Sequence, residues 1–205
     1  MLASTNLALA MAASPVHDLE TEMAAAVAAG ERAASERMAR QLLPQVRRVA
    51  RAMVRRPVDV DDASQVALLE VLRSAGNYRG EGSLEGWARR IAARAVMRWQ
   101  SKQHLRDAKT QALETTVDPR ETHLPTAVVD ALPRPLSHYL HALPVVQRDA
   151  FVLRHSLGHT LPEIAAITEA AVPTVKSRLI KAQQELRRLV RRDLALGVRQ
   201  KATLA

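Results

Sequence analysis

The segment TLPEIAAITEAAVPTVKSRLIKA, Thr160 to Ala182, predicts two helices separated by a tight turn. Thr160 and Glu163 have the spacing of a capping box, in which each side chain accepts a hydrogen bond from the other residue's backbone N–H. A short helix should therefore run from Leu161 to about Thr168. Pro173 suits the first position of the next helix, because the N–H that proline lacks has no partner there. A short helix, a turn and a longer helix make the plan of a helix-turn-helix.

The second of these helices has an apolar back and a polar, basic front. Val175, Leu179 and Ala182 recur at helical spacing, so they should pack inward, with Val172, Val175 and Leu179 facing the preceding helix. The front carries short polar or cationic side chains: Thr174, Lys176, Ser177, Arg178 and Lys181. Such side chains near the start of a helix can reach base edges in the major groove of DNA. Arginines further along suit backbone phosphates: Arg187, Arg188, Arg191 and Arg192.

A second basic helix is predicted from Ser83, its N-cap, to between Lys102 and Arg106. Cationic side chains recur every four residues along it: Arg90, Arg94, Arg98, Lys102 and Arg106. No acidic residue interrupts the stretch from Trp87 to Arg106, so the usual i,i+4 ion pairs cannot form within it. This pattern indicates an external anion as the partner. Trp87 shares the apolar face with Ile91 and Ala95 and is interpreted as a core residue.

The fold class is all-α, with two small helical domains joined by a flexible linker. Further helices are expected at 18–29, 31–56 and 59–74, and Pro44 should kink or split the second of them. The stretch 107–134 is rich in Thr and Pro and is interpreted as the linker. The expected order is a disordered leader (1–17), a first domain (18–106), the linker (107–134), a second domain (135–192) and a tail (193–205).

The composition points to an anionic partner and excludes several kinds of site. Thirty Lys and Arg against 21 Asp and Glu give a net charge of +9, for which nucleic acid is the first candidate. Without cysteine there is no disulfide or thiolate metal site, and we expect no metal, cofactor or small-molecule substrate. No nucleophile–base pair or carboxylate pair is evident, so no catalytic residue is predicted. The apolar run near the N-terminus lacks a preceding positive charge, so we expect a cytoplasmic protein with no membrane insertion.

The C-terminal stretch resembles region 4 of bacterial RNA polymerase sigma factors, most closely those of the extracytoplasmic-function (ECF) class. The matching motifs are Leu143-Pro144, Leu153-Arg154, Glu163-Ile164-Ala165 and Thr174 to Leu179. The first domain is similar to region 2 of the same family, through Asp61-Asp62 followed by Gln65, Tyr78-Arg79-Gly80 and Gly86-Trp87. The resemblance covers residues 31–106 and 135–192. Four positions depart from the family pattern: Glu169 and Pro173 stand where glycine is common, and Arg94 and Arg98 replace an asparagine and an aspartate.

The resemblance implies binding to core RNA polymerase and to promoter DNA, and control by an anti-sigma factor. Region 4 would read the −35 element through the front of its last helix, at the residues given above. Region 2 would capture the −10 element as a single strand, through Asn77, Tyr78, Arg79, Arg90, Arg94, Arg98 and Lys102. The polymerase would dock on a stripe formed by Asp61, Asp62, Gln65 and Leu69.

Two other kinds of protein remain open at this point. A helix-turn-helix regulator that is not a polymerase subunit would carry a receiver or ligand-binding domain in place of the first helical domain. A helical enzyme or nuclease would hold its substrate on the basic faces, and it would need clustered acids or histidines.

Overall fold

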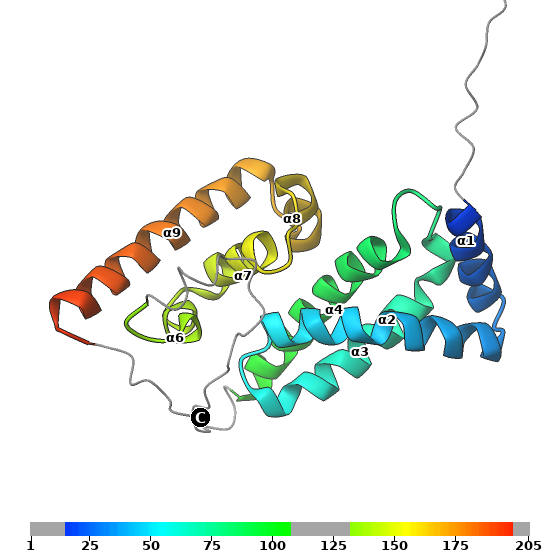
Figure 1. The fold of residues 1–205 in the computed structure, drawn as a ribbon, viewed down its shortest axis with the longest axis horizontal. Helices are drawn as coiled ribbons and strands as arrows, with labels where there is room; N and C mark the ends of the chain where they lie inside the picture. Colours follow the sequence, from blue (N-terminus) through cyan, green and yellow to red (C-terminus); the bar gives the residue numbers. More distant parts are fainter. Residues whose placement is uncertain (1–14, 108–131, 199–205) are drawn as a thin grey trace, which may run out of the picture.

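The computed structural model describes residues 15–107 and 132–198. Within these two ranges the regular structure is helical, without a strand, which confirms the all-α prediction. Residues 1–14, 108–131 and 199–205 lie outside the described residues. Most of the predicted leader, most of the predicted linker and the end of the predicted tail therefore fall there. The helices form two groups, seen on the right and the left of Figure 1.

The first group is built from four helices. They are α1 (Pro15–Ala28), α2 (Arg32–Met53), α3 (Val60–Arg73) and α4 (Leu84–Asp107), with the 3₁₀ helices η1 (Pro57–Asp59) and η2 (Ala75–Asn77) before and after α3. Helices α2, α3 and α4 pack against one another, and α1 lies against α2 and η2 (Figure 1). Small and aliphatic side chains such as Ala67, Val71 and Ala92 fill the space between them.

Pro44 lies inside α2 without splitting it. The proline is exposed, so its ring is on the solvent side of the helix. The opposite face is buried on both sides of Pro44, from Met38 and Leu42 to Val46 and Val49. Burial of this stripe outweighs the backbone hydrogen bond that proline removes.

The second group is formed by α6 (Leu136–His141), α7 (Val145–His155), α8 (Leu161–Thr168) and α9 (Val172–Ala195). The short helix α6 was not predicted. Helix α9 runs past Arg192, the last residue of the expected domain, because Asp193 is buried at the end of the helix. Its carboxylate accepts hydrogen bonds from Arg134 (2.9 Å) and from the Tyr139 hydroxyl (3.2 Å), which ties α9 to α6.

The two groups touch along two lines. Helix α4 faces α8, and the end of α2 faces α7. In Figure 1, α7 and α8 lie on the side of the second group that is turned toward α4. The basic stripe predicted on α4 is thus at the junction between the domains.

Candidate nucleic-acid and polymerase interfaces

The helix-turn-helix forms from α8 and α9 as predicted. The capping box is present: Thr160 N–H donates to the Glu163 carboxylate at 2.9 Å, and Glu163 N–H donates to the Thr160 hydroxyl at 3.4 Å. Ile164 and Ile167 of α8 are buried, as are Val175 and Leu179 of α9. Burial on both helices fixes the position of α9 relative to the rest of the domain.

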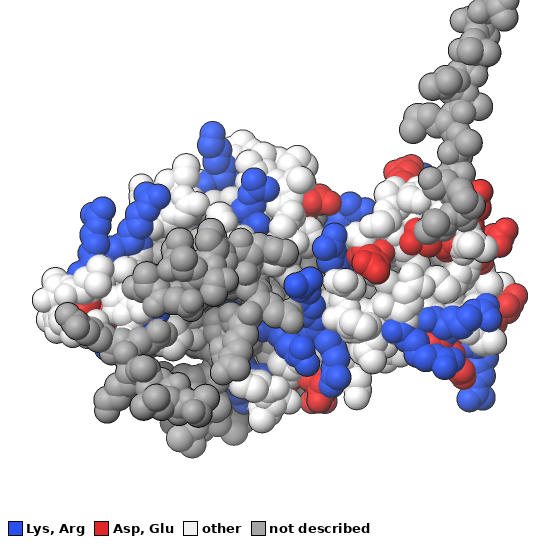
Figure 2. All heavy atoms as spheres, viewed as in Figure 1, with Lys and Arg blue, Asp and Glu red and all other residues white. Residues whose placement is uncertain are grey.

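The front of α9 is open to solvent. Thr174, Lys176, Ser177 and Lys181 are exposed, and Arg178 is half-buried. In the described part of the chain these five side chains have no hydrogen-bond or ion-pair partner. Lys and Arg side chains project along α9 in Figure 2. The α9 front therefore offers cationic and hydroxyl groups to an external ligand without first breaking a bond within the protein.

The arginine stripe of α4 is engaged by the second domain. Arg90 Nη1 lies 2.9 Å from Glu163 Oε1, and Arg94 Nη2 donates to the Ala166 carbonyl at 2.8 Å. Arg98 lies within 4 Å of two carboxylates, Glu70 at 3.9 Å and Glu169 at 3.8 Å. Lys102 is exposed. Carboxylates of this chain, on α8, at its C-terminal turn and on α3, therefore lie near Arg90 and Arg98, whereas the partner of Arg94 is a neutral backbone carbonyl.

Glu163 is the centre of this contact. Partial burial alone would raise the pKa of its carboxyl. Hydrogen bonds from the Thr160 backbone N–H, the Arg90 guanidinium and the Thr160 hydroxyl outweigh burial and hold that pKa at about 2. Glu163 is therefore ionised at neutral pH, and it serves the α8 cap and the domain contact at once.

The loop between η2 and α4 presents some of its predicted DNA-binding side chains and buries another. Asn77 and Arg79 are exposed. Tyr78 is only 6% exposed, and its hydroxyl lies 2.9 Å from Glu20 of α1 and 2.8 Å from the Gly82 carbonyl. Trp87 is partly buried against the core, as predicted, with its ring centroid 5.5 Å from that of Tyr78.

The stripe predicted for polymerase docking lies on one exposed side of α3. Asp61, Asp62, Gln65 and Leu69 are all exposed, and Leu69 is 51% exposed although it is apolar. Asp61 forms an ion pair with Arg47 of α2, whereas Asp62 and Gln65 are exposed without an assigned contact in the described residues. The stripe therefore combines a carboxylate, an amide and an apolar side chain.

Sequence reasoning missed the apolar residues beside this stripe. Val66 on α3 is 43% exposed, and Val58 in η1 is 78% exposed. Val58 stands between Pro57 and Asp59 in a tight 3₁₀ turn, a position with no periodic pattern to assign its face. Val66 stands four residues after Asp62 and three before Leu69, and this helical spacing could have indicated an exposed side chain.

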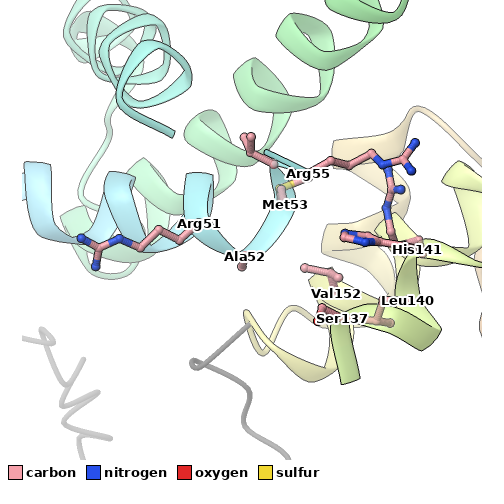
Figure 3. A pocket seen from close by; sticks show the side chains of 10 residues that line it. Arg51, Ala52, Met53, Arg55, Ser137, Leu140, His141 and Val152 are labelled. Atoms are coloured by element: carbon pink, nitrogen blue, oxygen red, sulfur yellow. The ribbon is translucent and has the colours of Figure 1, made fainter. Parts of the chain in front are cut away.

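A shallow pocket lies at the other line of contact between the domains (Figure 3). Its volume is about 20 Å³, and Met53, Leu140 and Val152 are among the residues that line it. Arg55, two residues past the end of α2, extends toward the second domain, whereas Arg51 points away (Figure 3). Burial and the charges of Arg55, Arg148 and His138 lower the pKa of His141. The pocket has room for about one water molecule and is too small for a cofactor.

Residues 15–107 and 132–198 hold no group of His, Asp or Glu arranged as metal ligands. No helix in these ranges is long and apolar enough to cross a membrane.

Two family models match the chain. Sigma-70 region 2 matches residues 38–109, and Sigma-70, region 4 matches residues 134–186. Together the two ranges cover more than half of the sequence.

Proteins related by sequence include the ECF RNA polymerase sigma factor SigM of Mycobacterium tuberculosis. It is 35% identical over 176 residues, which make up 83% of this chain and 84% of the relative. The RNA polymerase sigma-E factor of Streptomyces coelicolor is 31% identical over 150 residues, or 72% of this chain and 81% of the relative.

Two solved structures share the fold. CnrH in complex with the cytosolic domain of CnrY has a TM-score of 0.54 at 20% identity, covering 85% of this chain and 98% of the solved one. The sigma factor RpoE in complex with the anti-sigma factor NepR, from Bartonella quintana, has a TM-score of 0.55 at 20% identity, covering 74% and 92%.

Proposed function

The chain belongs to the sigma-70 family of RNA polymerase sigma factors, and we propose that, like the ECF sigma factors it matches, it binds core RNA polymerase and directs it to particular promoters. One observation carries the proposal: region 2 and region 4 occur in order in one chain, with the α9 front free of partners in the described residues. A regulator with a receiver or ligand-binding domain is not supported, because the first domain is helical and matches region 2.

The exposed surfaces suggest which part of the protein binds each element of the promoter and which part binds core polymerase. We assign the α9 front (Thr174, Lys176, Ser177, Arg178 and Lys181) to the −35 element as duplex DNA. The loop 77–83 and the α4 stripe (Arg90, Arg94, Arg98 and Lys102) are assigned to the −10 element as a single strand. Within the loop, Asn77 and Arg79 are exposed, so they are better placed than buried Tyr78 to contact DNA directly. The α3 stripe, with Asp62, Gln65 and Leu69, is assigned to core polymerase.

The α4 stripe cannot serve DNA and the second domain together. Arg90 and Arg94 use their guanidinium groups to hold Glu163 and the Ala166 carbonyl. A DNA strand bound along α4 would need the same groups for its phosphates. We therefore propose that α8 moves away from α4 when the −10 strand binds.

The proposed sigma-factor function also implies where the catalytic chemistry occurs, what controls the protein and where in the cell it acts. Sigma factors are non-catalytic initiation factors, so we propose that the polymerase supplies all the chemistry and that this chain has no enzymatic activity. We also propose control by an anti-sigma factor, as in the RpoE–NepR complex whose fold this chain shares. Because promoter DNA and polymerase are cytoplasmic in bacteria, we propose that the protein acts there.

Run-off transcription tests the proposal. Purified protein is mixed with core RNA polymerase and a library of genomic promoters, and transcript start sites are sequenced. We expect a small set of promoters to give transcripts only when the protein is present. A variant with Lys176, Arg178 and Lys181 all changed to Ala should still co-elute with core polymerase but lose promoter choice. If the wild type binds DNA yet neither co-elutes with polymerase nor sets start sites, the protein is a regulator outside the polymerase.

A further inference from the structure

Helix α1 makes a polar contact with the loop that leads into α4. Glu20 of α1 directs one carboxylate oxygen, Oε2, at two donors. The Tyr78 hydroxyl lies 2.9 Å from it, and the Leu84 backbone N–H donates to it at 3.2 Å. One side chain from a separate helix thus holds both ends of the segment 78–84.

The bond to Leu84 satisfies a donor that α4 cannot satisfy by itself. Leu84 is the first residue of α4, and the first N–H groups of a helix have no carbonyl partner within it. The Ser83 hydroxyl accepts from Gly86 N–H at 3.1 Å, which confirms Ser83 as N-cap but leaves the Leu84 N–H open. Glu20 fills that place, and its negative charge lies at the positive end of the helix dipole.

The bond to Tyr78 fixes the other end of the loop. The hydroxyl is placed between Glu20 and the Gly82 carbonyl, so the segment from Tyr78 to Gly82 folds back on itself. Burial, then the hydrogen bond and charge of Glu20, raise the pKa of Tyr78 to about 12. The hydroxyl therefore keeps its proton, and remains a donor, at any physiological pH.

The loop backbone also lies directly against α1. Gly80 has a φ of +73°, and a Cβ at this position would be 3.1 Å from the Thr21 hydroxyl. Glycine is needed here both for the left-handed backbone and for the close approach. With Tyr78 and Gly80 turned toward α1, Arg79 between them is exposed.

We propose that Glu20 is a positioning residue that sets the shape of the loop 77–83 and thereby the base preference at the −10 element. The proposal rests on the function proposed above, which assigns this loop to the opened −10 strand. Glu20 lies on α1, before the first residue of the stretch that matches region 2, so the family match does not assign it a role. It acts through Tyr78 and Leu84 and is not placed to touch the DNA itself.

Four variants separate the acceptor role of Glu20 from its charge and from general stability. Glu20→Ala removes the acceptor. Glu20→Gln keeps an amide oxygen that can accept both bonds. Tyr78→Phe removes only the hydroxyl. Glu22→Ala, on an exposed position of the same helix, removes an equal charge and is the matched control.

Each variant is combined with core polymerase on a promoter selected by the wild type and on a panel with single base changes in the −10 element. Open-complex formation is followed by abortive transcription. With Glu20→Ala we expect open-complex formation on the selected promoter to fall about three- to tenfold, since about one net hydrogen bond is lost at each end of the loop. Open-complex formation should also differ less between the best and the worst bases of the −10 element. Tyr78→Phe should shift the preference in the same direction. Glu20→Gln and Glu22→Ala should form open complexes within about twofold of the wild type. The affinity for core polymerase should be unchanged in all four variants.

Two results would overturn the positioning role: a wild-type base preference in Glu20→Ala, or a Glu20→Gln variant as defective as Glu20→Ala. Loss of core polymerase affinity together with base preference would also overturn it, because that outcome means a general loss of fold. Hydrogen exchange of the Leu84 amide in the free protein tests the contact independently of transcription. We expect protection in the wild type and Glu20→Gln and fast exchange in Glu20→Ala. If exchange behaves in this way but the wild type starts no transcripts, the function proposed above fails while the loop contact stands.

Discussion

One residue in the described part of the chain adopts a backbone conformation that its type does not favour. This residue is Glu169, with a φ of 52° at the C-terminal end of α8. The left-handed backbone costs an ordinary residue about 1–2 kcal/mol, which glycine avoids. The sequence already marked Glu169 as standing where glycine is common in the family. The turn still forms, since Ile167 and Val175 are buried on the two helices that it joins.

Replacing this residue should stabilise the second domain. We expect Glu169→Gly to raise the free energy of unfolding by about 1 kcal/mol, or the melting temperature by roughly 4–8 °C for a domain of this size. Glu169→Ala removes the same carboxylate but keeps the strained backbone, so it should give no gain. Calorimetry of the three proteins measures the difference. A glycine variant less stable than the wild type would mean that the carboxylate's contact with Arg98 outweighs the strain.

Two arginines of α9 should affect DNA binding in different ways. Arg178 lies on the α9 front, and Arg191 is exposed 13 residues further along the same helix. If Arg178 makes a bidentate contact with a base, Arg178→Ala should cost about 1–3 kcal/mol and relax specificity at one position of the −35 element. Arg191→Ala should weaken binding to all sequences evenly and reduce the salt slope by about one. Fluorescence anisotropy on a set of −35 duplexes, at several salt concentrations, distinguishes these outcomes. Equal binding of every duplex by Arg178→Ala and wild type would remove Arg178 from sequence recognition.

At the scale of elements, local pattern predicted most of the helices. The capping box of α8 and Ser83 as N-cap of α4 both appear where the sequence placed them. These features depend on residues within one or two helical turns of each other, so their spacing along the chain is sufficient. Helix α6 was missed because it is only one to two turns long and follows two prolines, Pro133 and Pro135.

The α8 cap should make the second domain sensitive to acid. Because the folded protein holds the pKa of Glu163 at about 2, below its ordinary 4.5, the folded domain binds fewer protons than the unfolded chain between these values. The stabilisation is therefore fully present above about pH 5 and is lost as the pH falls toward 2. Thermal melts at pH 6 and pH 3 should show a smaller acid-induced drop in Glu163→Gln than in the wild type. Glu169→Gln, which leaves the cap intact, should keep the wild-type drop. Equal drops in all three proteins would contradict the assigned role of Glu163.

At the scale of the whole molecule, the contact between α4 and α8 that joins the two domains is polar and partly exposed. The side chains of Arg90 and Glu163 remain 39% and 31% exposed. Ion pairs of this kind contribute only about 0.2–1 kcal/mol each and are screened by salt. The ion pair between α4 and α8 is therefore weak enough for DNA to compete with it.

Salt and DNA should both separate the domains. The chain has no cysteine, so labels on Gln41→Cys and Gln184→Cys, both exposed, report the distance between α2 and α9 by energy transfer. We expect this distance to increase on raising salt to about 0.5 M, where screening is strong, and on adding a single-stranded −10 oligonucleotide. Arg90→Ala with Arg94→Ala should produce the open distance at low salt, whereas Lys102→Ala should not. If the distance between the labels changes neither with salt nor in the variant with Arg90→Ala and Arg94→Ala, these contacts do not hold the domains together.

The sequence by itself determined the helical class, the helix-turn-helix with its cap, the basic faces and the family resemblance. Each of these depends on the order of residue types along one helix or across one turn. The exposed front of α9 followed from the same periodicity, because burial of one face leaves the other to solvent.

Only the tertiary structure decided which distant residues meet. Glu20 and Tyr78 are 58 positions apart, and Arg90 and Glu163 are 73 apart. No local spacing relates the members of such pairs; the packing of α1 on η2 and of α8 on α4 brings them together. The sequence predicted an external anion for the arginine stripe, whereas in the structure Arg90 and Arg98 lie near carboxylates of this chain. The position of the stripe at the domain junction depends on how the helices pack, which the order of residues along α4 does not specify.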